Sequence, residues 1–152
     1  MNSPPLAEQV LTVTAAPQGM GAAIARRLAE AGAAALVIAG RDAARGKAVA
    51  AEIEALGCAA EAVAGDLADL ANCRAVVAAC DDRFGRLDGL VNAAGLTDRG
   101  GIDDTSPETW DRLFAVNVRA PFFLAQEAVR LMRRNPITGQ RQAGAIVNII
   151  TM

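Results

Sequence analysis

The sequence contains no histidine and no tyrosine, and its only lysine is Lys47. Without histidine, the chain cannot build Ser-His-Asp or Cys-His catalytic groups or metal sites that use histidine. Its three cysteines, Cys58, Cys73 and Cys80, show no CxxC spacing. We therefore expect no metal site, and we interpret the cysteines as small hydrophobic residues in a reducing compartment.

Long apolar runs and a strong charge of one sign are also missing. No stretch of about 18 uncharged apolar residues occurs that would span a bilayer. Residues 1–5 have no basic residue followed by an apolar run, so no signal peptide is expected. The formal net charge is −2, which favours neither a nucleic-acid nor a membrane partner. A cytoplasmic protein is the default expectation.

Short apolar runs typical of strands alternate with segments of helical periodicity. Strands are expected at 10–14, 36–39, 60–64, 90–91 and 145–150, and helices at 19–31, 42–57, 69–85 and 110–132. Strands that are apolar on both faces require a parallel sheet covered on both sides. Right-handed crossovers then give the strand order 3-2-1-4-5. We predict an α/β fold with a Rossmann-type doubly wound parallel sheet, whose ligand crevice lies near Thr14 and Asn92.

The turn after the first strand has the spacing of a phosphate-binding loop. Its glycines let the backbone approach a pyrophosphate, whose charge is stabilised by free amides at the helix start. The alternative is a plain tight turn. The turn resembles the TGxxxGxG motif of the short-chain dehydrogenases, although Ala15 replaces the first glycine and Pro17 removes a backbone donor. The candidate cofactor-binding residues here are Thr14, Ala15, Gln18, Gly19, Met20 and Gly21.

The second strand ends in Gly40, Arg41 and Asp42. A carboxylate at this strand end would accept a hydrogen bond from the ribose 2′-hydroxyl of NAD. Gly40 stands in that place, and the guanidinium of Arg41 is suited to pair with a 2′-phosphate. The sequence therefore favours NADP(H) over NAD(H). The alternative is that Asp42 only caps a helix and Arg41 is a solvated charge.

Three further segments resemble the same family: Gly65 to Leu67 after the third strand, Asn92 to Gly95 after the fourth, and Trp110 to Val118 in the last helix. Because they occur in order and at consistent spacing, the chain is identified as a member of the short-chain dehydrogenase/reductase family. The resemblance implies cofactor contacts from Asp66, Leu67, Asn92, Ala93, Ala94, Gly95 and Val116, and it makes Asn117 the active-site asparagine.

Pro121 gives independent support to the role of Asn117. A proline cannot donate to the carbonyl four residues before it, and its ring crowds that carbonyl. The Asn117 carbonyl should therefore be freed from the helix, and the family uses such a carbonyl to hold a water in a proton relay. The alternative is a kink that only shapes the helix around the sheet.

Two other features of this helix are interpreted as structural. At its start, either Ser106 is the cap and Pro107 the first helical residue, or Thr105 and Glu108 form a capping box. Cations are also favourable near a helix C-terminus. That preference accounts for Arg130, Arg133, Arg134 and Arg141 without an anion site.

The family's catalytic group consists of a Ser or Thr hydroxyl, a Tyr phenol and a Lys that lowers the phenol pKa. Residues 146–151 resemble the strand that leads to the hydroxyl residue, so Thr151 is a candidate. The YxxxK motif has no counterpart in the sequence. We expect residues 1–152 to form an incomplete NAD(P)-binding Rossmann domain, truncated after strand 5 and inactive alone. The exposed fifth strand favours a homo-oligomer.

The expected function is that of an NADP(H)-linked alcohol dehydrogenase or carbonyl reductase. It would transfer a hydride between a small-molecule alcohol and the corresponding ketone. The alternative is a catalytically silent nucleotide-binding or oligomer-modulating module. A Rossmann-like methyltransferase is disfavoured by Arg41 and by the element from Asn92 to Gly95.

Overall fold

The fold is a five-stranded parallel sheet with helices on both faces, in a computed structural model that describes residues 5–136 and 144–150. The strand order is β3-β2-β1-β4-β5, which confirms the predicted Rossmann-type topology. The strands are β1 (Val10–Thr14), β2 (Ala35–Gly40), β3 (Ala59–Ala64), β4 (Gly89–Asn92) and β5 (Ala145–Asn148).

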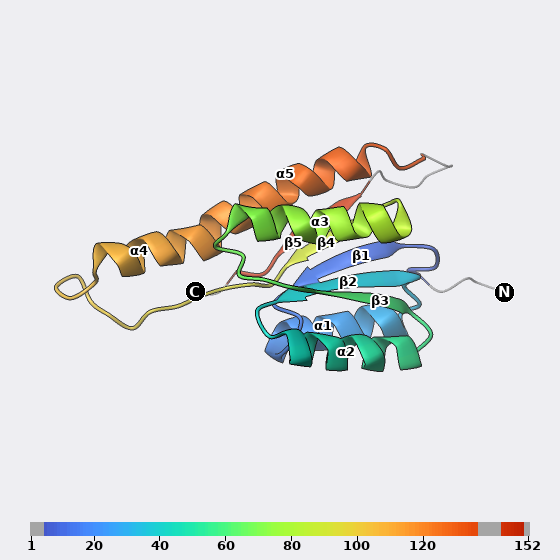
Figure 1. Cartoon of the computed structure of the whole chain (residues 1–152), viewed down its shortest axis with the longest axis horizontal. Coiled ribbons are helices and arrows are strands. Elements are labelled where there is room, and N and C mark those ends of the chain that lie inside the picture. Colours follow the sequence, from blue (N-terminus) through green and yellow to red (C-terminus); the bar gives the residue numbers. More distant parts are fainter. Residues whose placement is uncertain (1–4, 137–143, 151–152) are drawn as a thin grey trace.

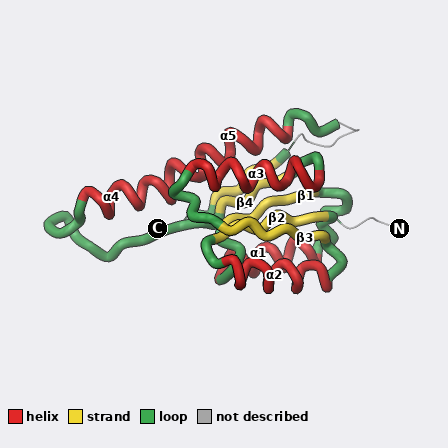
Figure 2. The backbone as a smooth tube through the Cα atoms, viewed as in Figure 1, coloured by secondary structure: helices red, strands yellow, loops and turns green. Residues whose placement is uncertain are grey.

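The helices form two layers, one on each side of the sheet (Figure 1 and Figure 2). One layer is α1 (Gly19–Glu30) and α2 (Ala43–Ala55), and the other is α3 (Leu70–Phe84) and α5 (Ala120–Met132). α5 continues a helix that starts with α4 (Pro107–Phe114) and passes through the π-helical turn η1 (Ala115–Arg119). α4 extends beyond the carboxyl ends of the strands (Figure 1).

Each face of the sheet carries its own core. Successive side chains of a strand point to opposite faces, so Leu36 packs with the core under α1 and α2, whereas Val37 packs with the core under α3 and α5. Both residues are fully buried. Cys73 and Cys80 belong to the second core. They are free thiols, as is Cys58 in the first core, which confirms their interpretation as buried hydrophobic residues.

The predicted helix ends are largely confirmed. Gly32 and Gly85 follow α1 and α3 with φ of +87° and +68°, a backbone region that glycine adopts at little cost. Asp42 and Asp69 cap α2 and α3 through their side chains. At the start of α4, Ser106 accepts a hydrogen bond of 3.1 Å from the amide of Thr109, so the first of the two capping alternatives is the one adopted.

The long helix differs from the predicted range 110–132 in its start and from regular α-helix in its middle. Periodicity alone placed its start at residue 110, but it begins at Pro107, as the alternative with Ser106 as the cap predicted. Its residues Ala115–Arg119 are π-helical, and the amide of Ala120 donates to the carbonyl of Ala115 five residues earlier. The disruption predicted next to Pro121 is therefore present as a π turn that contains Asn117, not as a simple kink.

β5 is shorter than predicted, ending at Asn148 rather than at residue 150. Among the described residues it pairs only with β4, and Val147 is 48% exposed. The candidate Thr151 lies outside the described residues. So does Arg141, whereas Arg134 forms two hydrogen bonds to Asp81, in agreement with a structural role. Within residues 5–136 and 144–150, no helix is long and apolar enough to cross a bilayer.

Candidate cofactor site

Thr14 joins the ends of the two central strands, β1 and β4. Its side chain is fully buried, and its Oγ1 accepts hydrogen bonds from the amides of Ala93 and Ala94 at 2.9 and 3.0 Å. Sequence reasoning placed a crevice between Thr14 and Asn92, and the structure brings these two strand ends together. Asn92 itself is buried and donates to Asn148 of β5 at 2.9 Å, a bond that links β4 to β5.

The turn after β1 is tightly folded around Gly21. A Cβ built at Gly21 would lie 2.3 Å from the carbonyl oxygen of Ala15, so position 21 requires glycine. Ala15 has φ of +54° and Gly19 of +56°. For alanine this left-handed conformation costs about 1–2 kcal/mol. Ala15 therefore adopts, at some cost in stability, the backbone conformation for which glycine is the usual choice.

The start of α1 differs from the starts of α2, α3 and α4. The side chains of Asp42, Asp69 and Ser106 cap the latter three helices, whereas the cap residue of α1, Gln18, forms no side-chain capping bond. The first turn of α1 also carries no acidic residue. Its leading amides therefore have no side-chain acceptor from the cap, and such amides attract an anion.

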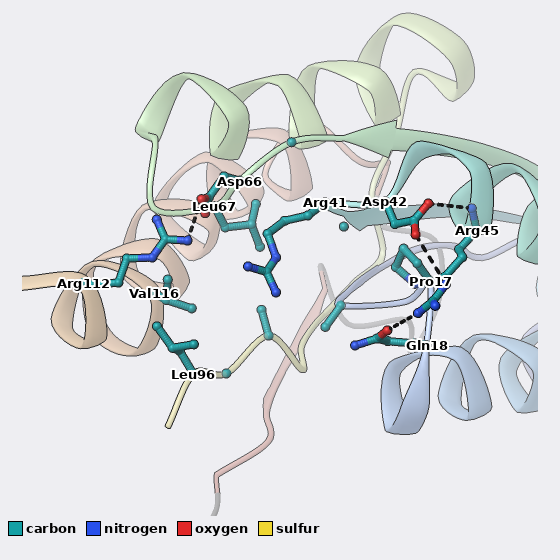
Figure 3. A pocket seen from close by; sticks show the side chains of 15 residues that line it. Pro17, Gln18, Arg41, Asp42, Arg45, Asp66, Leu67, Leu96, Arg112 and Val116 are labelled. Atoms are coloured by element: carbon teal, nitrogen blue, oxygen red, sulfur yellow. Dashed lines mark hydrogen bonds and ion pairs between the residues drawn. The ribbon is translucent and has the colours of Figure 1, made fainter. Parts of the chain in front are cut away.

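A pocket of about 540 Å³ opens in front of this turn (Figure 3), within the range of ligand sites. Of the residues predicted to bind a cofactor, its lining includes Ala15, Gln18, Arg41, Asp66, Leu67, Ala94, Gly95 and Val116. The other candidates lie at the neighbouring ends of β1 and β4 and at the start of α1 but are not in its lining: Thr14, Gly19, Met20, Gly21, Asn92 and Ala93. Met20 is instead 60% exposed.

Arg41 points into the pocket (Figure 3). Across the described residues its guanidinium forms no hydrogen bond and no ion pair. The neighbouring carboxylate of Asp42 accepts from the amide of Arg45 at 3.0 Å and lies 3.3 Å from its Nε. Arg45 also donates to Gln18 at 2.7 Å. Asp42 is thus a helix cap, as one interpretation proposed, and its charge is paired with Arg45.

Two lining arginines were missed at the sequence level. Arg45 lies in the first turn of α2, four positions after Arg41, so its place near the same strand end could have been found from the sequence. Arg112 comes from α4 and donates to Asp66 at 2.6 Å. No sequence signal connects these two residues, because they are 46 positions apart.

The carboxylate of Asp66 is engaged on both oxygens. One accepts from the amide of Ala68 at 3.0 Å and the other from Arg112. The Ala68 hydrogen bond and the positive charges of Arg112 and Arg41 hold the pKa of Asp66 below its ordinary value, although desolvation opposes them. Asp66 therefore stays ionised in the pocket wall at neutral pH.

Asn117 fixes the loop that follows β4. Its Oδ1 accepts from the amide of Leu96 at 2.8 Å, and its Nδ2 donates to the carbonyl of Leu96 at 2.7 Å. The preceding residue, Val116, lines the pocket. The π turn is thus tied to the loop through the side chain of Asn117, a role that sequence reasoning did not foresee.

The chain is similar to known proteins over most of its length. The family described as short chain dehydrogenase matches residues 9–152. The short-chain dehydrogenase/reductase FrzI of Cladobotryum sp is 38% identical over 131 residues, which are 86% of this chain and 51% of that protein. The chain spans about half the length of the curated relatives it matches.

Solved structures resemble the fold closely. A metagenomic short-chain oxidoreductase in complex with NADP has a TM-score of 0.85 and 37% identity, over 97% of this chain and 64% of that one. L-Sorbose reductase from Gluconobacter frateurii, complexed with NADPH and L-sorbose, has a TM-score of 0.85 and 30% identity, over 94% and 52%. With the family match over nearly its whole length, this chain belongs to the short-chain dehydrogenase/reductase family of oxidoreductases.

Proposed function

We propose that this chain binds NADP(H) in the pocket at the carboxyl ends of β1, β2 and β4. The observation that carries this proposal is the combination of an uncapped helix start with a strand end that has an arginine and no free acid. The uncapped amides of α1 suit a pyrophosphate. Arg41 suits a 2′-phosphate, and Asp42 is engaged by Arg45. Two similar structures were solved with NADP or NADPH.

The protein is proposed to interconvert an alcohol and a ketone. When bound, NADPH would supply the hydride for such a reduction. The chain would contribute amides that hold the phosphates, and Asn117 would keep the Leu96 loop in place beside the pocket. We assign the main-chain carbonyl of Asn117, in its π turn, to holding a water for proton transfer. Thr151 remains the candidate for polarising the substrate carbonyl.

Residues 1–152 alone are proposed to bind the cofactor without turning over a substrate. The sequence has no tyrosine to donate a proton, and Lys47 is an exposed residue of α2 outside the pocket lining. The same observation favours the second candidate function, a silent nucleotide-binding module. Adding carbonyl substrates to the NADPH-bound chain tests this proposal: the absorbance of NADPH should stay constant, and a fall in that absorbance would show that residues 1–152 are active alone.

Binding is tested by titrating NADPH and following its fluorescence. We expect Arg41→Ala to raise the NADPH dissociation constant at least about tenfold, since a phosphate–guanidinium pair is a strong charge-assisted interaction. The control is Arg27→Ala, which removes the same charge from an exposed side chain in the last turn of α1. An unchanged dissociation constant for Arg41→Ala would refute the assignment of the 2′-phosphate site.

Self-association is proposed through the outer face of the long helix. Exposed apolar side chains recur there every four residues, so they form one continuous stripe: Trp110, Phe114, Val118 and Phe122. Phe122 is 62% exposed. Stripes of this kind mark association surfaces. Sedimentation velocity should give a dimer or larger species that Phe122→Glu dissociates, and a wild-type monomer at all concentrations would contradict the proposal.

A further inference from the structure

The ring of Pro17 closes the space next to Gly40. A Cβ built at Gly40 would lie 2.4 Å from both Cδ and Cγ of Pro17, a separation that real Cβ atoms essentially never show. The Pro17 ring cannot rotate away, because it is fused to the backbone and fixes φ. Position 40 therefore cannot carry a side chain without moving the turn between β1 and α1, which contains Pro17 and is called the phosphate turn below.

Position 40 is the last residue of β2, the place from which a carboxylate would reach the ribose hydroxyls of a dinucleotide. We propose that Pro17 is a specificity-determining residue. Because it excludes an acidic side chain from position 40, the end of β2 favours a cofactor with a 2′-phosphate over one with a 2′-hydroxyl. This inference rests on the proposed NADP(H) function. It adds a residue of the phosphate turn to the groups that decide between the two cofactors.

The exclusion is specific to one position. A Cβ built at Gly46, the other glycine beside Pro17, would lie 3.9 Å from Cγ of Pro17 and 3.5 Å from Cβ of Ala62. Both are ordinary van der Waals distances. The structure thus tolerates a methyl group at position 46 and not at position 40, so Gly46→Ala serves as a matched control.

The charges around the closed position agree with this assignment. Arg41 and Arg45 both line the pocket beside Pro17. Of the two acids in the lining, Asp42 is held by the amide and Nε of Arg45, and Asp66 is held by Arg112. The side-chain oxygen Oε1 of Gln18 accepts a hydrogen bond from the guanidinium of Arg45 at 2.7 Å. A 2′-phosphate here would meet two cations and no unpaired carboxylate.

The first experiment measures whether Pro17 closes position 40. In Pro17→Ala the ring atoms Cγ and Cδ are gone, and the remaining Cβ lies 3.6 Å from the Cβ position of residue 40. We expect Gly40→Ala to weaken binding of adenosine 2′,5′-bisphosphate at least about tenfold in the wild-type background, and less than about threefold in Pro17→Ala. Gly46→Ala should stay within about twofold of wild type. Equal losses in both backgrounds would overturn the proposal.

The second experiment measures the preference itself, with adenosine 2′,5′-bisphosphate and adenosine 5′-monophosphate as probes in calorimetric titrations. The double variant Pro17→Ala/Gly40→Asp should shift the ratio of the two affinities toward the monophosphate by about a hundredfold relative to wild type, because a carboxylate repels the 2′-phosphate. Gly40→Asp alone should bind both probes poorly. If Gly40→Asp alone switches the preference as fully as the double variant, Pro17 has no such role.

Thermal unfolding separates this inference from the function on which it rests. If the wild type binds neither probe, the proposed function fails. The unfolding temperatures of the same variants still decide whether Pro17 closes position 40. If Gly40→Ala lowers the unfolding temperature of the wild type but not that of Pro17→Ala, Pro17 closes position 40. The same follows if Gly40→Ala folds only together with Pro17→Ala. If the two substitutions lower the unfolding temperature additively, Pro17 does not close position 40.

Discussion

Replacing Thr14 by valine tests the junction that holds the pocket together. Valine keeps the shape of threonine but removes Oγ1, which accepts the amides of Ala93 and Ala94 inside a fully buried site. Each such bond contributes about 0.5–1.5 kcal/mol, and leaving a partly buried amide without an acceptor adds to the loss. We expect Thr14→Val to lower the free energy of unfolding by about 2–3 kcal/mol. For a chain of this size, that corresponds to a drop in Tm of roughly 6–10 °C.

Thr12 provides the matched control, since it lies on the same strand and is equally buried. Within residues 5–136 and 144–150, the one hydrogen-bond partner of its hydroxyl is the sulfur of Cys80, at 3.0 Å. That thiol also donates to the carbonyl of Val76. Thr12→Val should therefore cost less than about 1 kcal/mol. Urea unfolding followed by circular dichroism measures both values. If Thr14→Val were no more destabilising than Thr12→Val, the bonds from Thr14 to the loop after β4 would not support the fold as argued.

Three further predictions concern other parts of the molecule. Asn117→Ala should speed hydrogen exchange of the Leu96 amide by about tenfold or more, since it removes both bonds to that residue; unchanged exchange would show that the π turn does not hold the loop. The pKa of Asp66 is lower in the folded chain than its ordinary value, because the ionised carboxylate is bonded to Ala68 and Arg112. Asp66 therefore stabilises the fold fully at pH values above its ordinary pKa, and this stabilisation is lost as the pH falls through its folded-state pKa. Asp66→Asn should thus lose less stability between pH 7 and pH 3 than wild type in urea unfolding, and an identical loss would contradict this. Burial raises the pKa of the Cys58 and Cys80 thiols to about 11. A disulfide reagent at pH 8 should therefore modify these two buried thiols only when the chain unfolds. Immediate reaction of both thiols in the native chain would refute their burial.

The order of the strands could be predicted from the sequence because local signals mark each strand and helix, and right-handed crossovers then give the order. β1 has the predicted bounds, since an apolar run there ends before a turn that contains Pro17. The cap at Asp69 and the turn at Gly85 depend equally on residues next to each other. Helix and strand periodicity carries this local information directly.

The parts of the site that could not be predicted depend on contacts between distant residues. Asn117 reaches Leu96 across 21 positions, and Arg112 reaches Asp66 across 46. No periodic pattern encodes such pairs. The disruption beside Pro121 was foreseeable because proline lacks an amide proton. Its form, a π turn over Ala115–Arg119, could not be foreseen from the proline alone.

The central claim is that a dinucleotide lies between the phosphate turn and the loop after β4, at the carboxyl ends of the strands. Titrating the isotope-labelled chain with NADPH and following its backbone amides by NMR tests this claim most directly. The account predicts the largest shift changes at Gly19, Gly21 and Gly95. Changes centred instead on Gly32 and Gly57, in the turns where strands begin, or no changes at saturating NADPH, would contradict it.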